Sequence, residues 1–148
     1  MAYRFGKRSS DKLATCHPTL IAIAQRALER SPYDITIVHG WRGEDVQNGL
    51  FDSHASTKRW PDSMHNHTDL DGKPLSLAID FAPYVGGTIP WNETHIFAVI
   101  AGLLFSAAKE LGATLRWGGD WDTDGNTKEH SLQDWGHVEL ILDLPEAA

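Results

Sequence analysis

The stretch Leu77-Ala78-Ile79-Asp80-Phe81 alternates between two kinds of side chain, as a strand with one buried face does. Its three large apolar residues predict contact with the core. On the other side, Ser76 and Ala78 leave room around the carboxylate of Asp80, which predicts a pocket there. The simpler alternative is an aspartate that caps a turn at the strand end. We expect a strand over residues 74–81, with Asp80 facing away from the core.

Helices and further strands are expected on both sides of this segment. Apolar spacings of three and four predict helices over residues 11–30, 44–51 and 93–111. Short β-branched or alternating runs predict strands over residues 34–38, 114–117 and 137–142. Pro18 is expected to interrupt the first helix, and Asn92 or Thr94 to cap the last. The polar residues 52–74 are typical of a long functional loop.

Composition and charge restrict the class of protein. The chain has 148 residues, 41% of them hydrophobic, which suffices for one domain with a sizeable core. The 20 acidic and 13 basic residues give a net charge of −7, which opposes binding to nucleic acid. The single cysteine, Cys16, excludes an internal disulfide. Residues 1–8 lack a signal-peptide pattern, and no apolar run approaches the roughly 20 residues of a membrane span. We expect one domain over residues 1–148, a monomer made in the cytoplasm without membrane insertion.

Three side chains from separate segments have the chemistry of a metal site. His137 begins a predicted strand three residues after Asp134, and His65 lies in the polar loop ahead of Asp80. Two imidazoles and a carboxylate form a ligand set for catalytic zinc, which keeps a fourth position open for water. We predict that His65, Asp80 and His137 bind Zn²⁺ and that Asp134 is the general base. His67 is an alternative or companion to His65, since residues i and i+2 share a face in extended chain.

Arg42 follows the strand predicted over residues 34–38, in the turn His39-Gly40-Trp41-Arg42. One interpretation is a surface ion pair. The other is a cation aimed into the site, where it holds a substrate carboxylate or stabilises a developing oxyanion.

Several ordered motifs resemble those of a zinc peptidase family. They are Gly40-Trp41-Arg42, Ser63-x-His65, Ala78-x-Asp80-x-x-Pro83, Arg116-Trp117-Gly118-Gly119-Asp120-Trp121 and Asp134-x-x-His137-x-Glu139. The family comprises D-alanyl-D-alanine carboxypeptidases and the phage endolysins that are L-alanyl-D-glutamate endopeptidases. Asp134 and the Trp-Gly-Gly-Asp-Trp run resemble the endolysin branch. Asp80 follows His65 by 15 residues where seven is common in the family, which indicates a loop insertion over residues 66–74.

The resemblance implies an α+β fold, in which helices pack against a small antiparallel sheet and the zinc site lies on the open face. It implies a peptidoglycan-hydrolysing endopeptidase that cleaves the L-alanyl-D-glutamate bond of the stem peptide and contributes to host cell lysis. Asp134 and Arg42 would be catalytic, Ser63 and Trp121 would contact the substrate, and Trp117 would line the groove or fill the core. Such an enzyme would act on the wall in the periplasm after release from the cytoplasm. The alternatives are a D,D-carboxypeptidase that acts on D-Ala-D-Ala ends and a non-catalytic wall-binding module.

A second pattern is similar to a calcium loop. Asp120, Asp122 and Asp124 stand at positions 1, 3 and 5, and Gly125 stands at position 6. Position 12 is Ser131, where a bidentate glutamate is expected, so a plain acidic turn is the alternative. If the segment is a calcium loop, Ca²⁺ would regulate it.

Overall fold

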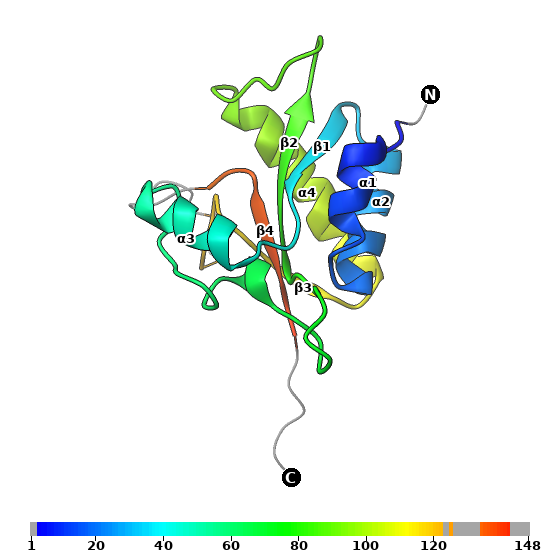
Figure 1. The fold of residues 1–148 in the computed structure, drawn as a ribbon. Helices are drawn as coiled ribbons and strands as arrows, with labels where there is room; N and C mark the ends of the chain where they lie inside the picture. The colour runs from blue at the N-terminus through cyan, green and yellow to red at the C-terminus, as the bar shows by residue number, and fades with distance from the viewer. Residues whose placement is uncertain (1–2, 123–124, 126–133, 143–148) are drawn as a thin grey trace.

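The computed structural model describes residues 3–122, 125 and 134–142, arranged as Figure 1 shows. The helices are α1 (Lys7–Leu13), α2 (Pro18–Arg30), α3 (Glu44–Asp52) and α4 (Thr94–Glu110), with a short 3₁₀ helix η1 (Met64–Asn66). The strands are β1 (Asp34–His39), β2 (Ala78–Tyr84), β3 (Thr114–Trp117) and β4 (His137–Ile141). They pair in the order β1-β2-β4-β3, and every pairing is antiparallel. The expected α+β fold with a small antiparallel sheet is confirmed.

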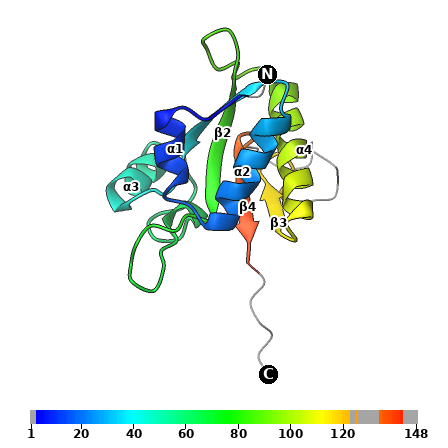
Figure 2. The same cartoon turned by 90° about the vertical axis from the view of Figure 1, so that its right-hand side faces the viewer.

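The two sides of the sheet are covered differently. Helices α1, α2 and α4 lie against one side, and α3 lies on the other, as Figures 1 and 2 both show. The core between sheet and helices joins Ile79, Phe81 and Val138 of the strands to Ile23 of α2 and Ile100 of α4. Because side chains alternate along a strand, the polar residues of β2 and β4 project from the opposite side. That side, toward α3 and η1, is the open face.

Strand pairing places Asp80 at the centre of the open face. In the antiparallel register, Asp80 of β2 is the partner of His137 on β4 and of His39 on β1. A shift of one residue would exchange Ile79 or Phe81 for Asp80 in the core, so burial of the apolar side chains fixes this register. Core packing therefore determines where the carboxylate lies.

Two sequence predictions about helix ends need correction. Residues 11–30 do not form one helix, because α1 ends at Leu13 and α2 begins at Pro18. Pro18 takes the first helical position, where its missing N–H leaves no hydrogen bond unmade, and His17 caps the helix by accepting from the Thr19 N–H at 3.1 Å. The prediction of a cap for α4 is also wrong. Glu93 stands at that position, and its side chain makes no capping hydrogen bond.

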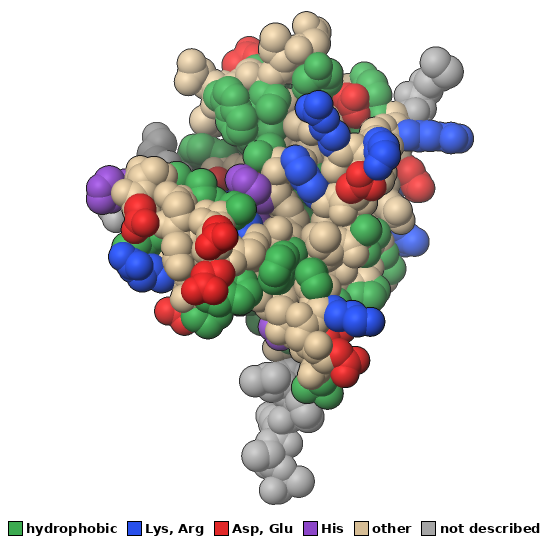
Figure 3. Space-filling model, viewed as in Figure 1, with side chains coloured by type: hydrophobic (Ala, Val, Ile, Leu, Met, Phe, Trp, Pro, Cys, Tyr) green, Lys and Arg blue, Asp and Glu red, His purple; other side chains and the backbone are tan. Residues whose placement is uncertain are grey.

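One end of the molecule exposes apolar side chains. Figure 3 shows them gathered above β2 and α4, and the large exposed residues here are Tyr84 at the end of β2 and Val85 and Trp91 in the connection that follows. Within the described residues, no helix combines the length and the apolar character that crossing a membrane requires.

Candidate active site

His65 is held in place by η1 and by a glycine carbonyl. Ser63 caps η1, and its Oγ accepts a hydrogen bond from the His65 N–H at 3.2 Å. The imidazole is 1% exposed, and its Nδ1 lies 2.7 Å from the carbonyl oxygen of Gly40. A carbonyl oxygen only accepts, so Nδ1 carries the proton and Nε2 presents its lone pair. The backbone of Gly40 also lies close to the carbonyl oxygen of Lys12. A Cβ at position 40 would collide with that oxygen, so this position requires glycine.

His137 is oriented by a carboxylate on its own strand. Its Nε2 lies 2.8 Å from Oε1 of Glu139, two residues along β4 and on the same face. The other carboxylate oxygen of Glu139 pairs with Arg116 at 3.1 Å. Burial alone would lower the pKa of His137, but its hydrogen bonds to Asp80 and Glu139 raise that pKa to about 9. The protein therefore favours a positive charge at this point, which a proton or a metal ion can supply.

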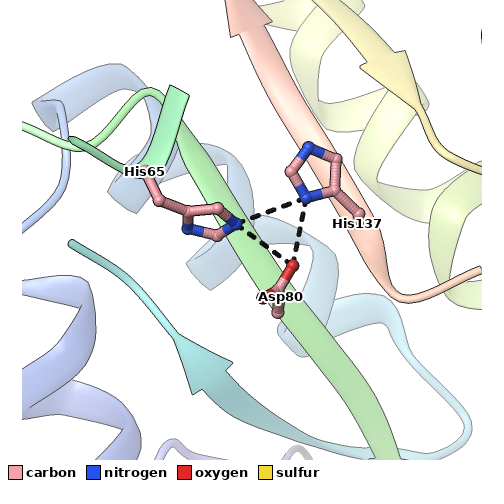
Figure 4. Close-up of side chains that lie close together, drawn as sticks. All are labelled: His65, Asp80 and His137. Atoms are coloured by element: carbon pink, nitrogen blue, oxygen red, sulfur yellow. Dashed lines mark hydrogen bonds and ion pairs between the residues drawn. The ribbon is translucent and has the colours of Figure 1, made fainter. Parts of the chain in front are cut away.

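Three electron-pair donors converge on the open face (Figure 4). Oδ1 of Asp80 lies 3.0 Å from Nδ1 of His137 and 3.2 Å from Nε2 of His65, and the two nitrogens are 3.3 Å apart. Ligands at zinc bond lengths of about 2.0–2.2 Å in a tetrahedron lie roughly 3.3–3.5 Å from one another, close to these separations. In the described part of the chain, this is the one cluster of at least three His, Cys, Asp or Glu side chains able to hold a metal ion. Both the donor set and its spacing fit zinc.

The second oxygen of Asp80 is also engaged. Oδ2 pairs with the guanidinium of Arg42 and lies 3.1 Å from Nδ1 of His39. Burial would raise the pKa of Asp80, but the neighbouring imidazoles of His65, His137 and His39 hold that pKa well below its usual range. Asp80 is therefore an ionised carboxylate with partners on both oxygens. Arg42 lies inside the site, and the interpretation as a surface ion pair is wrong.

Gln47 connects the site to its surroundings. Its side chain is fully buried, and its Oε1 accepts from Nδ2 of Asn66 at 3.2 Å and from Nη1 of Arg42 at 3.4 Å. Its Nε2 donates to Oγ of Ser56 at 3.0 Å and to the carbonyl oxygen of Lys58 at 2.7 Å. One amide thus joins Arg42, the η1 segment and residues 56–58. Sequence reasoning missed Gln47 and His39, although a glutamine on the inner face of a predicted helix was a usable signal.

Asp134 lines a cavity of about 500 Å³ that His65 and His137 also line. Its N–H donates to the carbonyl oxygen of Gly118 at 2.9 Å, and a Cβ on Gly118 would collide with the carbonyl oxygen of Asp134. Asp134 is an exposed residue, yet desolvation in the cavity wall, and then the charge of Asp80, raise the pKa of its carboxyl group. A raised pKa makes a carboxylate a better proton acceptor near neutral pH.

Other predicted residues fall inside or outside this cavity. Ser63 and Trp121 both line it, and the Trp121 ring centroid lies 5.5 Å from that of His137. His67 is exposed and does not belong to the cluster, so the structure favours His65. Trp117 is buried in the core, where its Nε1 donates to the carbonyl oxygen of Trp135 at 2.8 Å. The alternative that Trp117 lines the groove is wrong.

The predicted calcium loop is described only in part. Oδ2 of Asp120 accepts a hydrogen bond from the N–H of Gly125 at 2.8 Å. Asp124 lies outside the described residues, so calcium binding by Asp120, Asp122 and Asp124 stays a prediction.

Comparisons with known proteins agree on one family. Residues 1–141 match the model of the family described as phage L-alanyl-D-glutamate peptidase. The chain is 40% identical to the L-alanyl-D-glutamate peptidase of Escherichia phage T5 over 149 aligned positions, which cover 95% of this chain and 100% of that protein. The crystal structure of the Serratia marcescens L-Ala D-Glu endopeptidase ChiX superposes with a TM-score of 0.74 at 27% identity, over 95% of this chain and 91% of that one. The resemblance to the endopeptidase branch is thus confirmed, and the chain belongs to the phage L-alanyl-D-glutamate peptidase family.

Proposed function

We propose that this chain is a zinc-dependent endopeptidase that cleaves the L-alanyl-D-glutamate bond of peptidoglycan stem peptides and contributes to host cell lysis. Its family supports the bond that is cleaved. The observation that supports zinc is the meeting of two imidazole nitrogens and one carboxylate oxygen within 3.3 Å of one another beside a cavity. Membership in a phage family supports action on the wall in the periplasm, after synthesis in the host cytoplasm.

His65, Asp80 and His137 would hold the ion. Bound there, zinc would supply a Lewis acid that polarises the scissile carbonyl and lowers the pKa of water. Gly40 and Glu139 fix the rings so that each histidine turns its free nitrogen toward the same point. Asp80 contributes one oxygen to this point, while Arg42 and His39 hold the other.

Asp134 and Arg42 would perform the proton and charge chemistry. Asp134 accepts the proton of the attacking water and returns it to the leaving nitrogen, a role that its raised pKa and its place in the cavity wall support. The Arg42 guanidinium stands beside the same cavity and would stabilise the oxyanion that forms when the carbonyl is attacked. Arg42 is held by Gln47 and Asp80, so little reorganisation is needed during the reaction.

Product mapping with a general-base variant tests the proposal. The wild type, loaded with zinc, is expected to release new D-glutamyl amino termini from purified Gram-negative peptidoglycan, and a chelator should stop the reaction until zinc is restored. Asp134→Asn should lower kcat by about 10²- to 10⁴-fold while zinc content and Tm stay at wild-type values, because it removes a proton acceptor and no metal ligand.

The matched control is Asp62→Asn, an exposed aspartate outside the cavity. Release of D-alanine in place of D-glutamyl termini would instead identify a D,D-carboxypeptidase. Full activity of Asp134→Asn would refute the assigned base, and full activity without metal would refute zinc dependence.

A further inference from the structure

The active-site cleft has two chemically different ends. The cavity of about 500 Å³ adjoins a second one of about 430 Å³, and Arg42, Ala55 and Asp134 line both. Lys58 and Arg116 line only the first cavity, which we call the basic end. The second is the aromatic end, lined by Trp91, Phe97 and Trp135. The proposed catalytic groups Arg42 and Asp134 therefore stand where a basic half and an aromatic half meet.

Lys58 offers an ammonium group on a fixed piece of backbone. Its carbonyl oxygen accepts from the buried Gln47 at 2.7 Å, and its N–H donates to Oγ of Ser56 at 3.2 Å. Its side chain is exposed and forms no ion pair with any residue that the structure describes. Lys58 itself lines the cavity of about 500 Å³, together with Glu139 and His137, so its ammonium can reach a ligand bound there.

Arg116 places a second cation in the same wall. Its Nη2 pairs with Oε2 of Glu139 at 3.1 Å, and its guanidinium carbon lies 5.2 Å from the ring centre of Trp121. Its Nε is buried without a hydrogen-bond partner among the described residues. Both oxygens of Glu139 are occupied, one by His137 and one by Arg116. The charge of Glu139 is thus neutralised, and among the residues that the structure describes the charge of Lys58 is left for a ligand.

The substrate of an L-alanyl-D-glutamate peptidase carries its charge on one side of the scissile bond. Glutamate has two carboxyl groups, and a linear stem peptide uses only one of them to continue the chain. The other remains a free carboxylate on the side of the leaving nitrogen. The alanyl side offers a methyl group and no charge. A cleft with cations at one end matches this asymmetry.

We propose that Lys58, with Arg116 beside it, binds the free carboxylate of the D-glutamyl residue. The substrate then lies with its D-glutamyl side in the basic end and its L-alanyl side in the aromatic end, and the scissile amide lies between Arg42 and Asp134. Lys58 is a specificity-determining residue, because its ion pair is present before and during bond cleavage and so acts on binding. This inference rests on the proposed function and adds the direction in which the substrate lies.

Two stem peptides that differ only in this carboxylate test the inference. One carries the free acid and the other a carboxamide, and both are cleaved by the zinc-loaded protein. The wild type is expected to prefer the acid by about three- to tenfold in kcat/KM, mainly through KM, as suits a charge pair with an exposed lysine. Rising salt should reduce the preference, because it screens exposed charges.

Variants of Lys58 then locate the effect. Lys58→Gln should cleave both peptides equally well, and Lys58→Glu should prefer the amide, while kcat for the amide stays within about twofold of wild type. The matched control is Arg59→Gln, which removes one positive charge at the next residue. Its guanidinium points elsewhere, 4.4 Å from the Phe51 ring centre and 3.5 Å from Asp52, so the preference should survive.

The outcomes separate this inference from the proposed function. Equal cleavage of both peptides by the wild type, or an unchanged preference in Lys58→Gln, overturns the role of Lys58 and leaves the peptidase intact. Cleavage of neither peptide by the zinc-loaded wild type overturns the proposed function itself. The wild-type comparison requires no substitution, so the inference can be overturned even if the Lys58 variants fail to fold.

Discussion

The two sides of the sheet bury their side chains in different ways. On the helix-covered side, Ile100 of α4 is 0% exposed and packs among apolar residues. On the open side, Gln47 of α3 is also 0% exposed, but its amide makes hydrogen bonds in four directions. Apolar contact stabilises without a preferred direction, whereas hydrogen bonds fix directions. The comparison indicates that the covered side supplies stability and that the open side positions the catalytic groups.

Substitution on the covered side should give the largest change in stability. Ile100→Ala removes buried methyl and methylene groups, so we expect the free energy of unfolding to fall by about 2–5 kcal/mol. Because Ile100 belongs to the hydrophobic core and lines neither of the two active-site cavities, kcat at a temperature where the variant stays folded should match wild type. Urea denaturation and peptidoglycan hydrolysis measure the two effects. A large fall in kcat in the folded variant would break the division between the two sides.

Substitution on the open side should change both quantities. Gln47→Met keeps a similar volume but removes one hydrogen-bond partner each from the Asn66 amide and the Lys58 carbonyl, at a cost of about 1–3 kcal/mol of unfolding free energy. Arg42 and Asn66 of η1 lose the hydrogen bonds that Gln47 Oε1 accepts from them and are held less firmly, so kcat should also fall by roughly tenfold or more. The control is Gln25→Met, an exposed glutamine on α2. If Gln47→Met loses stability with kcat intact, Gln47 is structural only and the comparison weakens.

The same contrast explains what the sequence could predict. The alternation around Asp80 and the spacing of Asp134, His137 and Glu139 are local patterns, and they led to the core face and to two members of the metal cluster, Asp80 and His137. The contacts of His39 and Gln47 depend on how distant segments meet: His39 reaches Asp80 through strand register, and Gln47 reaches Lys58 through the path of a loop. No local pattern encodes such meetings. Pro18 marks the interruption that the sequence predicted, but a proline that interrupts a helix and one that starts a new helix look alike in sequence, so the two separate helices were not foreseen.

The smallest expected effect concerns a polar contact on the covered side. Glu110 of α4 accepts from Arg26 at 2.9 Å and from Arg30 at 2.8 Å, which joins α4 to α2. Hydrogen bonds from Arg30 and Arg26 lower the pKa of Glu110 from 4.5 to about 2. Between these values the unfolded chain binds more protons, so this contribution to stability is full above pH 4.5 and is lost as the pH falls toward 2. If apolar packing dominates this side, the contribution should be small.

Glu110→Gln should therefore lower Tm by roughly 1–3 °C at pH 7, since the pair is half exposed and screened, and kcat should not change. The Tm difference from wild type should shrink as the pH falls from 5 to 3, because the wild-type carboxylate begins to protonate and its ion pairs weaken. A double-mutant cycle with Arg30→Gln isolates the coupling, which should follow the same pH dependence. A Tm difference that grows toward acid pH would mean that Glu110 is destabilising as a carboxylate. The ion pairs between α2 and α4 would then play no part in holding the helix-covered side together.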